Sequence, residues 1–207
     1  MIGMKFKNIL AVSLAAALAL PCALPAAEPS SHDFRRAVEL YDNGMYDRAL
    51  TIFESLPSDP LTDGYSVLCA VKMRTEGYPL LISEYDRRYP SSVLTPHIRF
   101  ENARLLFDAG NYGEAALEFS KVDSSVLDAQ QTSEYIFKCG YCEFSLGRQT
   151  EALQFFMILE ALDFSEYTAP GRYLTGVIYY DDSRFAEAEA SFWKASSDPR
   201  FTQLCEF

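Results

Sequence analysis

Small and apolar side chains recur along the chain at fixed distances from five turn residues. The turns are marked by Gly44, Gly77, Gly110, Gly147 and Ser183, at intervals of 33, 33, 37 and 36 residues. Intervals of this length are typical of a repeated helix-turn-helix unit. Apolar positions within each unit follow the period of a helix, and the two-residue alternation of a half-buried strand is missing. The pattern predicts an all-α chain of about five helical hairpins.

Seven places before its turn, each unit carries a small residue. These residues are Ala37, Ala70, Ala103, Gly140 and Gly176. Helix axes approach closely only where the side chains at the crossing are short. A small residue at one fixed place in every unit therefore predicts a close contact between two helices.

The second helix of a unit carries a matching pair, an alanine five places after the turn and a phenylalanine nine places after it. The pairs are Ala49 and Phe53, Ala115 and Phe119, Ala152 and Phe156, and Ala188 and Phe192. Residues one helical turn apart share a face, so the alanine permits a close approach and the ring fills the space beside it.

The second unit departs from this pattern. Its turn at Gly77-Tyr78-Pro79 is one residue shorter, and Leu81 and Tyr85 are expected to take the alanine and phenylalanine places. We expect this unit to be distorted.

Helix boundaries follow from the alignment and from capping signals. First helices are expected over 31–43, 63–76, 95–109, 130–146 and 168–181, and second helices over 46–56, 79–88, 112–121, 149–161 and 184–196. Thr95 before Pro96 is typical of an N-cap followed by a proline at the first helical position. Asn111 with Glu114 resembles a capping box. Prolines fall between the units at Pro57, Pro60, Pro90 and Pro199.

The first 27 residues predict a secretory signal peptide. Lys5 and Lys7 precede an apolar run from Ile9 to Leu20, and small residues interrupted by prolines follow up to Ala27. The run is too short and wrongly flanked for a good transmembrane helix. Cleavage near Ala27 would leave one repeat domain over 28–207, outside the cytoplasm and without a transmembrane span.

Cys22 allows a second interpretation of this segment, in which it is the lipid-modified cysteine of a bacterial lipoprotein. Pro21 directly before it disfavours that interpretation. Both interpretations place the mature chain outside the cytoplasm.

Charge excludes two classes of partner. The chain has a formal net charge of −11, and removal of Lys5 and Lys7 with the signal would make it more acidic. Such a surface repels nucleic acid and anionic lipid headgroups. The predicted partners are therefore proteins or peptides.

The order of residues within a unit is characteristic of one repeat family. A small residue, an aromatic, Gly-x-Tyr, Ala and Phe follow one another from Ala37 to Phe53 and again from Ala103 to Phe119, which resembles the tetratricopeptide repeat. The resemblance runs from about residue 31 to the end, although the fourth unit has Gln149 for the tyrosine and the fifth has Ser183 for the glycine. It implies a right-handed superhelix whose first helices line a concave groove for peptides or proteins.

Combined with the export signal, the chain is similar to the periplasmic tetratricopeptide proteins of bacterial envelopes. That similarity implies a non-enzymatic scaffold for protein binding, without a cofactor. It also implies groove residues at first-helix places five, nine and twelve: Phe34, Val38, Tyr41, Phe100, Arg104, Phe107, Phe137, Tyr141, Phe144, Tyr173, Val177 and Tyr180.

An exposed aromatic stripe of this kind would suit an apolar or extended peptide. The alternative is that the rings at places five and twelve pack between repeats as core, which is the commoner fate of aromatic residues. Arg104 and Tyr141 are the members of the set that we expect to be exposed.

A thiol oxidoreductase is the rival function from another class, because Cys139 and Cys142 stand three residues apart. They fall in the middle of a predicted helix, where no helix N-terminus lowers a thiol pKa, so buried structural thiols are favoured. Cys69 holds the same place as Cys139 two units earlier and is not expected to pair with it. Cys205 has no assigned role.

Other chemistry is weakly represented. His32 and His97 lack a carboxylate pattern suited to zinc, and no nucleophile elbow, phosphate loop or dinucleotide fingerprint occurs. Asp181 and Asp182 are expected to be solvated turn residues.

Residues 201–207 resemble the start of another first helix, whereas solenoids normally finish with a polar helix. This pattern leaves two further interpretations open. The chain is the amino-terminal part of a longer array that serves as an assembly module, or it self-associates through this apolar end.

Overall fold

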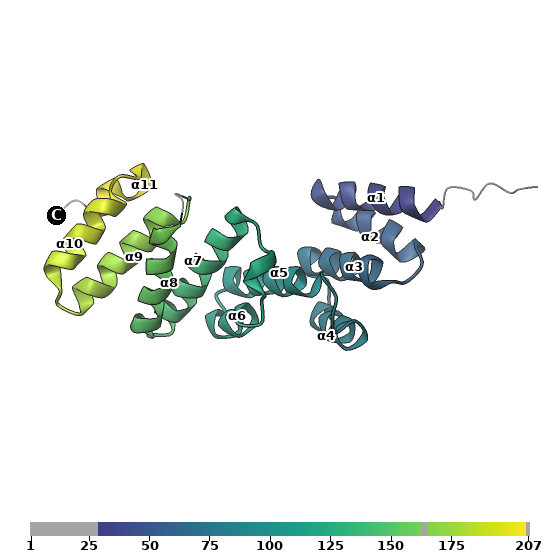
Figure 1. The fold of residues 1–207 in the computed structure, drawn as a ribbon, viewed down its shortest axis with the longest axis horizontal. Coiled ribbons are helices and arrows are strands. Elements are labelled where there is room, and N and C mark those ends of the chain that lie inside the picture. Colours follow the sequence, from purple (N-terminus) through teal and green to yellow (C-terminus); the bar gives the residue numbers. More distant parts are fainter. Residues whose placement is uncertain (1–28, 163–164, 206–207) are drawn as a thin grey trace, which may run out of the picture.

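The computed structural model describes residues 29–162 and 165–205. The predicted signal peptide and Cys22 lie outside the described residues. Within them every regular element is a helix, and the helices stack one after another into an elongated, curved array with α1 at one end and α10 and α11 at the other (Figure 1). The predicted all-α repeat architecture is confirmed.

Ten helices form five consecutive hairpins. They are α1 (Pro29–Asp42) with α2 (Tyr46–Ser55), α3 (Pro60–Met73) with α4 (Tyr78–Arg88), α5 (Thr95–Asp108) with α6 (Tyr112–Phe119), α7 (Ala129–Ser145) with α8 (Gln149–Ala161), and α9 (Thr168–Asp181) with α10 (Phe185–Ala195). Three short elements complete the chain: η1 (Ser124–Val126), α11 (Pro199–Thr202) and η2 (Gln203–Cys205).

The predicted turn residues close four of the hairpins in the same way. Gly44, Gly110, Gly147 and Ser183 have φ angles of 75°, 78°, 76° and 62°. Each donates its N–H to the carbonyl three residues back, and the following residue donates to the carbonyl five residues back. This is the Schellman ending of a helix, which requires a left-handed residue and favours glycine there.

The predicted close contact within a hairpin is confirmed in the fourth and fifth units. A Cβ atom built on Gly140 would lie 2.7 Å from the Phe156 ring, and one on Gly176 would lie 2.7 Å from the Phe192 ring. Both rings are buried. The small residue therefore lets the second-helix phenylalanine lie directly on the backbone of the first helix.

Two of the predicted caps are wrong. Leu94 is the residue before α5, and Thr95 already belongs to the helix with its hydroxyl buried and unpaired. Asn111 precedes α6 as predicted, but its side chain makes no capping hydrogen bond. A capping box occurs instead at the start of α7, where Asp128 accepts from the Gln131 N–H at 2.8 Å.

The second unit is distorted, as expected, but not in the way that the alignment predicted. The Schellman residue that ends α3 is Arg74, with φ 54°, and Gly77 instead precedes α4. Because α3 ends early and begins at Pro60, the predicted range 63–76 is wrong at both ends. Ile82, not Leu81, is buried at the alanine place, whereas Tyr85 is buried as predicted.

The junction between the second and third units also differs from the others. At the regular junctions the second helix of one unit packs on the first helix of the next, as α2 does on α3, α6 on α7 and α8 on α9. At this junction α5 packs on α3 instead, and α4 lies to one side (Figure 1). Arg99 of α5 spans the junction through ion pairs with Asp86 of α4 and Glu118 of α6.

Candidate partner-binding surfaces

The predicted groove aromatics at place five lie between consecutive units. The Phe34 ring centroid lies 5.7 Å from that of Phe53 in its own unit and 5.8 Å from that of Tyr65 in the next. Phe137 stacks on Tyr167 at 5.3 Å. Rings at this place therefore link one unit to the next and expose only part of their surface.

Rings at place twelve form a second type of contact, which we call a ring triad. In the first unit Tyr41 meets Tyr46 edge-on across the hairpin turn, with centroids 5.3 Å apart, and Tyr65 of α3 closes the cluster at 5.4 Å from Tyr41. Burial raises the pKa of Tyr41 far above its ordinary value, helped by the carboxylate of Glu101. The first triad is thus built by two units together.

The third unit repeats the triad with a tyrosine that was predicted to be exposed. Phe107 and Tyr112 meet edge-on at 5.5 Å, and Tyr141 of α7 lies 5.3 Å from both rings. Tyr141 also reaches Phe137 and Phe144, so it is half-buried among rings. The prediction that Tyr141 is exposed is therefore only partly right, because the neighbouring rings leave just part of its ring exposed to solvent.

The remaining predicted groove residues differ in exposure. Phe100 is almost fully buried, Val38, Phe144, Tyr173 and Val177 are half-buried, and Tyr180 is 56% exposed.

Charged side chains from α3, α5 and α7 run across the first-helix face of the second, third and fourth units. We call this set the ionic ladder, and it consists of Lys72, Glu101, Arg104, Asp108, Glu134 and Lys138. It contains three cations and three carboxylates. Of these residues only Arg104 was predicted from the sequence, because its partners come from helices about 30 residues apart.

Arg104 lies at the centre of the ladder. Its guanidinium group lies 2.8 Å from Glu134 and 3.1 Å from Glu101, and its side chain is 34% exposed. Burial lowers the pKa of Arg104, but the two carboxylates outweigh it and the pKa is raised. Lys138 lies 3.1 Å from Glu134, and both side chains are largely buried. The partly exposed Arg104 is therefore already paired in the free protein.

The two thiols of the rival redox interpretation are buried in α7. Cys139 is 6% exposed and Cys142 is fully buried, and both are free. Burial raises the pKa of each thiol to about 12. A reactive thiol needs a lowered pKa and access to solvent, so this environment opposes thiolate chemistry.

Residues 29–162 and 165–205 contain no cluster of three or more histidine, cysteine, aspartate or glutamate side chains placed to hold a metal ion. None of their helices is both long and apolar enough to cross a bilayer.

The two ends of the array differ in polarity. At the start of α1 the exposed residues His32, Arg35, Arg36 and Glu39 give a charged face. At the other end Tyr180, Phe185 and Trp193 are 56%, 59% and 77% exposed. Together with Ala188, Glu189 and Cys205 these three rings surround an open pocket of about 370 Å³. The apolar end was predicted from residues 201–207, of which Leu204 is 58% exposed, Phe201 is half-buried, and residues 206–207 lie outside the described residues; the exposed rings belong to α9 and α10 instead.

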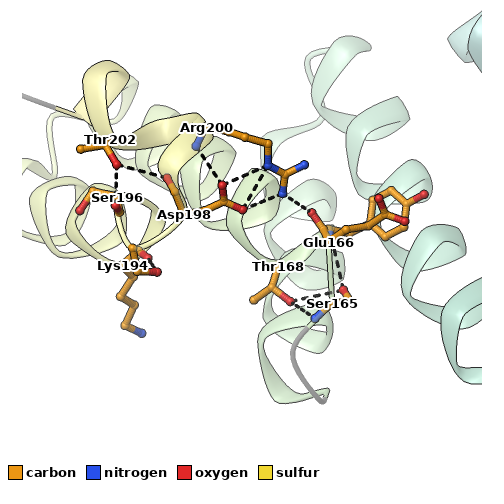
Figure 2. Close-up of polar contacts among 10 residues, drawn as sticks. Ser165, Glu166, Thr168, Lys194, Ser196, Asp198, Arg200 and Thr202 are labelled. Atoms are coloured by element: carbon orange, nitrogen blue, oxygen red, sulfur yellow. Dashed lines mark hydrogen bonds and ion pairs between the residues drawn. The ribbon is translucent and has the colours of Figure 1, made fainter.

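Figure 2 shows how the segment after α10 is held against the fifth unit. Asp198 caps α11 by accepting from the Arg200 N–H at 2.9 Å, and the Arg200 guanidinium donates to the Glu166 carbonyl at 3.0 Å. Phe201 packs on Tyr173 with centroids 5.4 Å apart, much as Tyr167 packs on Phe137. The segment therefore starts like another first helix before it continues as η2.

Comparison with known proteins defines the fold. Neither a protein-family model nor a curated protein matches the chain. Among solved structures, MamA AMB-1 superposes with a TM-score of 0.65 at 18% identity, over 83% of this chain and 92% of that one. MamA MSR-1 superposes with a TM-score of 0.61 at 17% identity, over 81% of this chain and 95% of that one. A putative kinesin light chain of Podosopora anserina with TPR-like repeats superposes with a TM-score of 0.54 at 12% identity, over 84% of this chain and 95% of that one.

At these identities the likeness concerns the fold. It agrees with the Schellman turns and with the small-residue and phenylalanine contacts described above. The chain therefore has the fold of a tetratricopeptide repeat protein, a superhelical array of five helical hairpins.

Proposed function

We propose that the protein is a non-enzymatic scaffold that binds a partner protein or peptide of the bacterial cell envelope through the first-helix face of its central units. The observation that carries the proposal is the ionic ladder beside the Tyr141 ring triad. It provides charges of both signs and an aromatic surface on adjacent first helices. An extended segment with matching charges can exchange ion pairs with Arg104 and lie on the exposed part of Tyr141.

Support for the envelope as the site of action comes from residues 1–27 alone. Their basic start, apolar run and small-residue exit are those of a secretory signal. The test is cell fractionation of the full chain, with intact-mass measurement of the exported form. Recovery of an uncleaved chain in the cytoplasm would contradict this part of the proposal.

A photocrosslinking amino acid at Tyr141 tests the binding face. The matched control carries the same crosslinker at Leu117, which is 64% exposed on α6. We expect one defined partner to be crosslinked in cells from position 141 and not from position 117. Equal crosslinking from both positions, or none from position 141, would contradict the proposal.

The variant Arg104→Gln supplies a second readout. It removes one charge from the ladder while keeping a polar side chain, and we expect it to reduce crosslinking from position 141. Thermal unfolding of this variant, followed by circular dichroism, checks that the fold is retained. Unchanged crosslinking would show that the ionic ladder is not part of the binding face.

A further inference from the structure

The third unit shows how a lysine side chain is held at the end of a first helix. Lys138 of α7 places its Nζ atom 4.6 Å from the centroid of the Phe107 ring and 3.1 Å from the Asp108 carboxylate, and Glu134 adds a second carboxylate at 3.1 Å. The ring and the first carboxylate belong to consecutive residues at the end of α5. An ammonium group in this position gains a cation–π interaction and an ion pair together.

The first unit repeats the ring and the carboxylate without the lysine. Tyr41 and Asp42 end α1 as Phe107 and Asp108 end α5, and both aromatic residues belong to ring triads. In α3 the place of the lysine, nine residues before the predicted turn, is taken by Leu68. This side chain is buried in the apolar cluster against which Tyr41 packs. The first unit therefore has the arrangement that holds a lysine, but an apolar side chain where the lysine would start.

The Asp42 carboxylate is available to a ligand. Asp42 is exposed, and its side chain forms neither an ion pair nor a hydrogen bond with any residue of 29–162 and 165–205. The last turn of α1 contains no basic residue. The helix dipole disfavours a carboxylate at the C-terminal end of a helix, and a nearby cation relieves that cost. Lys138 supplies this cation for Asp108, whereas none of the described side chains supplies it for Asp42.

The charges around the first triad favour a cation. Burial raises the pKa of Tyr41, and the carboxylate of Glu101 raises it further. Burial also raises the pKa of Tyr65, and there the second cause is the carboxylate of Asp42. Negative charge therefore acts on two hydroxyls of the triad. Lys72 is paired with Glu101 and its side chain is only 20% exposed, so it is not free to serve Asp42.

We propose that Tyr41 and Asp42 form a binding site for a lysine side chain of a partner protein. The ammonium group lies on the exposed part of the Tyr41 ring and forms an ion pair with Asp42, as the protein's own lysine does in the third unit. The net charge of −11 adds a weaker attraction of the same sign. This site lies in the first unit, outside the central units of the proposed function, and its test requires no partner.

An NMR titration of the ¹⁵N-labelled full chain tests the site. The probe is Nα-acetyl-lysine amide, and the matched control is the same compound acetylated at Nε, which keeps the stem and loses the charge. Sodium chloride keeps the ionic strength equal. The backbone amides of Asn43 and Gly44, directly after Asp42, are the reporters. We expect saturable shifts with the probe, with a Kd on the order of 10–100 mM for one exposed cation–π contact and one exposed ion pair, and none with the control.

Variants of the full chain locate the site. Asp42→Asn removes the charge at nearly constant size and should raise the Kd of the probe about threefold. Asp47→Asn, which removes an exposed carboxylate from the first turn of α2, is its matched control and should leave the Kd unchanged. Tyr41→Leu should raise the Kd about twofold to fivefold, because the aromatic face is lost. Tyr41→Phe keeps that face, as in the third unit, and should bind like the wild type. Circular dichroism confirms that each variant is folded.

Three outcomes would overturn the inference. The first is no saturable shift of the Gly44 amide up to the solubility limit of the lysine probe. The second is an equal shift with the uncharged control, or an unchanged Kd for Asp42→Asn. The third is a shift of the same amides with protein concentration alone, with a doubled mass in light scattering, which would assign the surface to a second copy. Crosslinking from position 141 is measured separately, so failure here leaves the proposed function standing.

Discussion

The fourth unit and the second unit bring their two helices together at different points. In the fourth, Gly140 in the middle of α7 lies on the Phe156 ring. In the second, Gly64 near the start of α3 faces Tyr85, whose hydroxyl donates to the Pro60 carbonyl at 2.6 Å. A buried phenylalanine needs only a flat surface, whereas a buried tyrosine must also satisfy its hydroxyl. The Tyr85 hydroxyl therefore ties α4 to the start of α3.

This difference reaches the neighbouring unit. With α4 anchored at the start of α3 and displaced by the early end of α3 at Arg74, α5 packs on α3 rather than on α4. One irregular hairpin thus changes the junction that follows it, while the array resumes its regular packing from α6 to α9. In a repeat protein, each unit contacts mainly its neighbours, so such a change stays local.

The largest expected loss of stability comes from removing the contact between Phe156 and Gly140 in the regular fourth unit. Phe156→Ala should lower the free energy of unfolding by about 3–5 kcal/mol, because the ring is buried against Gly140 and leaves a cavity. Leu81→Ala in the irregular unit should change it by less than about 0.5 kcal/mol, since that side chain is 40% exposed. Urea unfolding measures both. Similar losses for the two variants would contradict the assigned core.

Two glycine substitutions test the close approach itself. Gly140→Ala should cost about 1–3 kcal/mol, because the new Cβ would lie 2.7 Å from the Phe156 ring. Gly113→Ala in α6 is the matched control, since a Cβ there meets nothing within 4 Å. The control should stabilise the protein by about 0.4–1 kcal/mol, because alanine restricts the unfolded chain. Thermal or urea unfolding measures both variants. A lower stability of Gly140→Ala together with a higher stability of Gly113→Ala would support the close approach at Gly140.

Removing one hydroxyl tests the polar anchor of the second unit. Tyr85→Phe should lower stability by about 0.5–1.5 kcal/mol, because the hydroxyl's hydrogen bonds with the Pro60 carbonyl and with Ser92 are lost while the ring is kept. Hydrogen exchange should show faster opening of α4 and unchanged protection of α8. Unaltered hydrogen exchange in α4 would mean that the Tyr85 hydroxyl does not anchor this helix.

The smallest expected effect is the pH dependence of stability that comes from Glu118, which pairs with Arg99 at the irregular junction. Burial raises the pKa of Glu118, but hydrogen bonds from Lys121 and Arg99 outweigh it and lower the pKa below its ordinary value of 4.5. The ionised carboxylate therefore stabilises the fold above about pH 4.5, and this contribution is lost as the pH falls through the lower folded-state pKa.

Glu118→Gln removes that titration. The variant should be less stable than the wild type at pH 7 by about 1 kcal/mol or less, and the difference should shrink as the pH falls below 4.5. Urea titrations across this range measure it. A difference that is independent of pH would assign the effect to packing rather than to the carboxylate.

Much of the fold was predictable because the repeat signature is local. The left-handed turns at Gly44, Gly110 and Gly147 and the contact of Gly176 with Phe192 follow from spacing within one unit. The caps were less predictable, because Asn111 has the right residue type without the geometry. Groove residues were predicted as an aromatic stripe, but their rings divide between junctions, triads and one exposed end.

The sequence by itself determined that this chain forms helical hairpins, where most of them turn, and, in the fourth and fifth units, which small residue of the first helix meets which phenylalanine. These properties depend on helical periodicity and on contacts about 16 residues apart. Only the tertiary structure decided the ionic ladder, the ring triads and the position of α4, because they join units about 30 residues apart. Their geometry depends on how consecutive hairpins are stacked, and that stacking differs at the second unit, where α3 ends early and Tyr85 buries a hydroxyl.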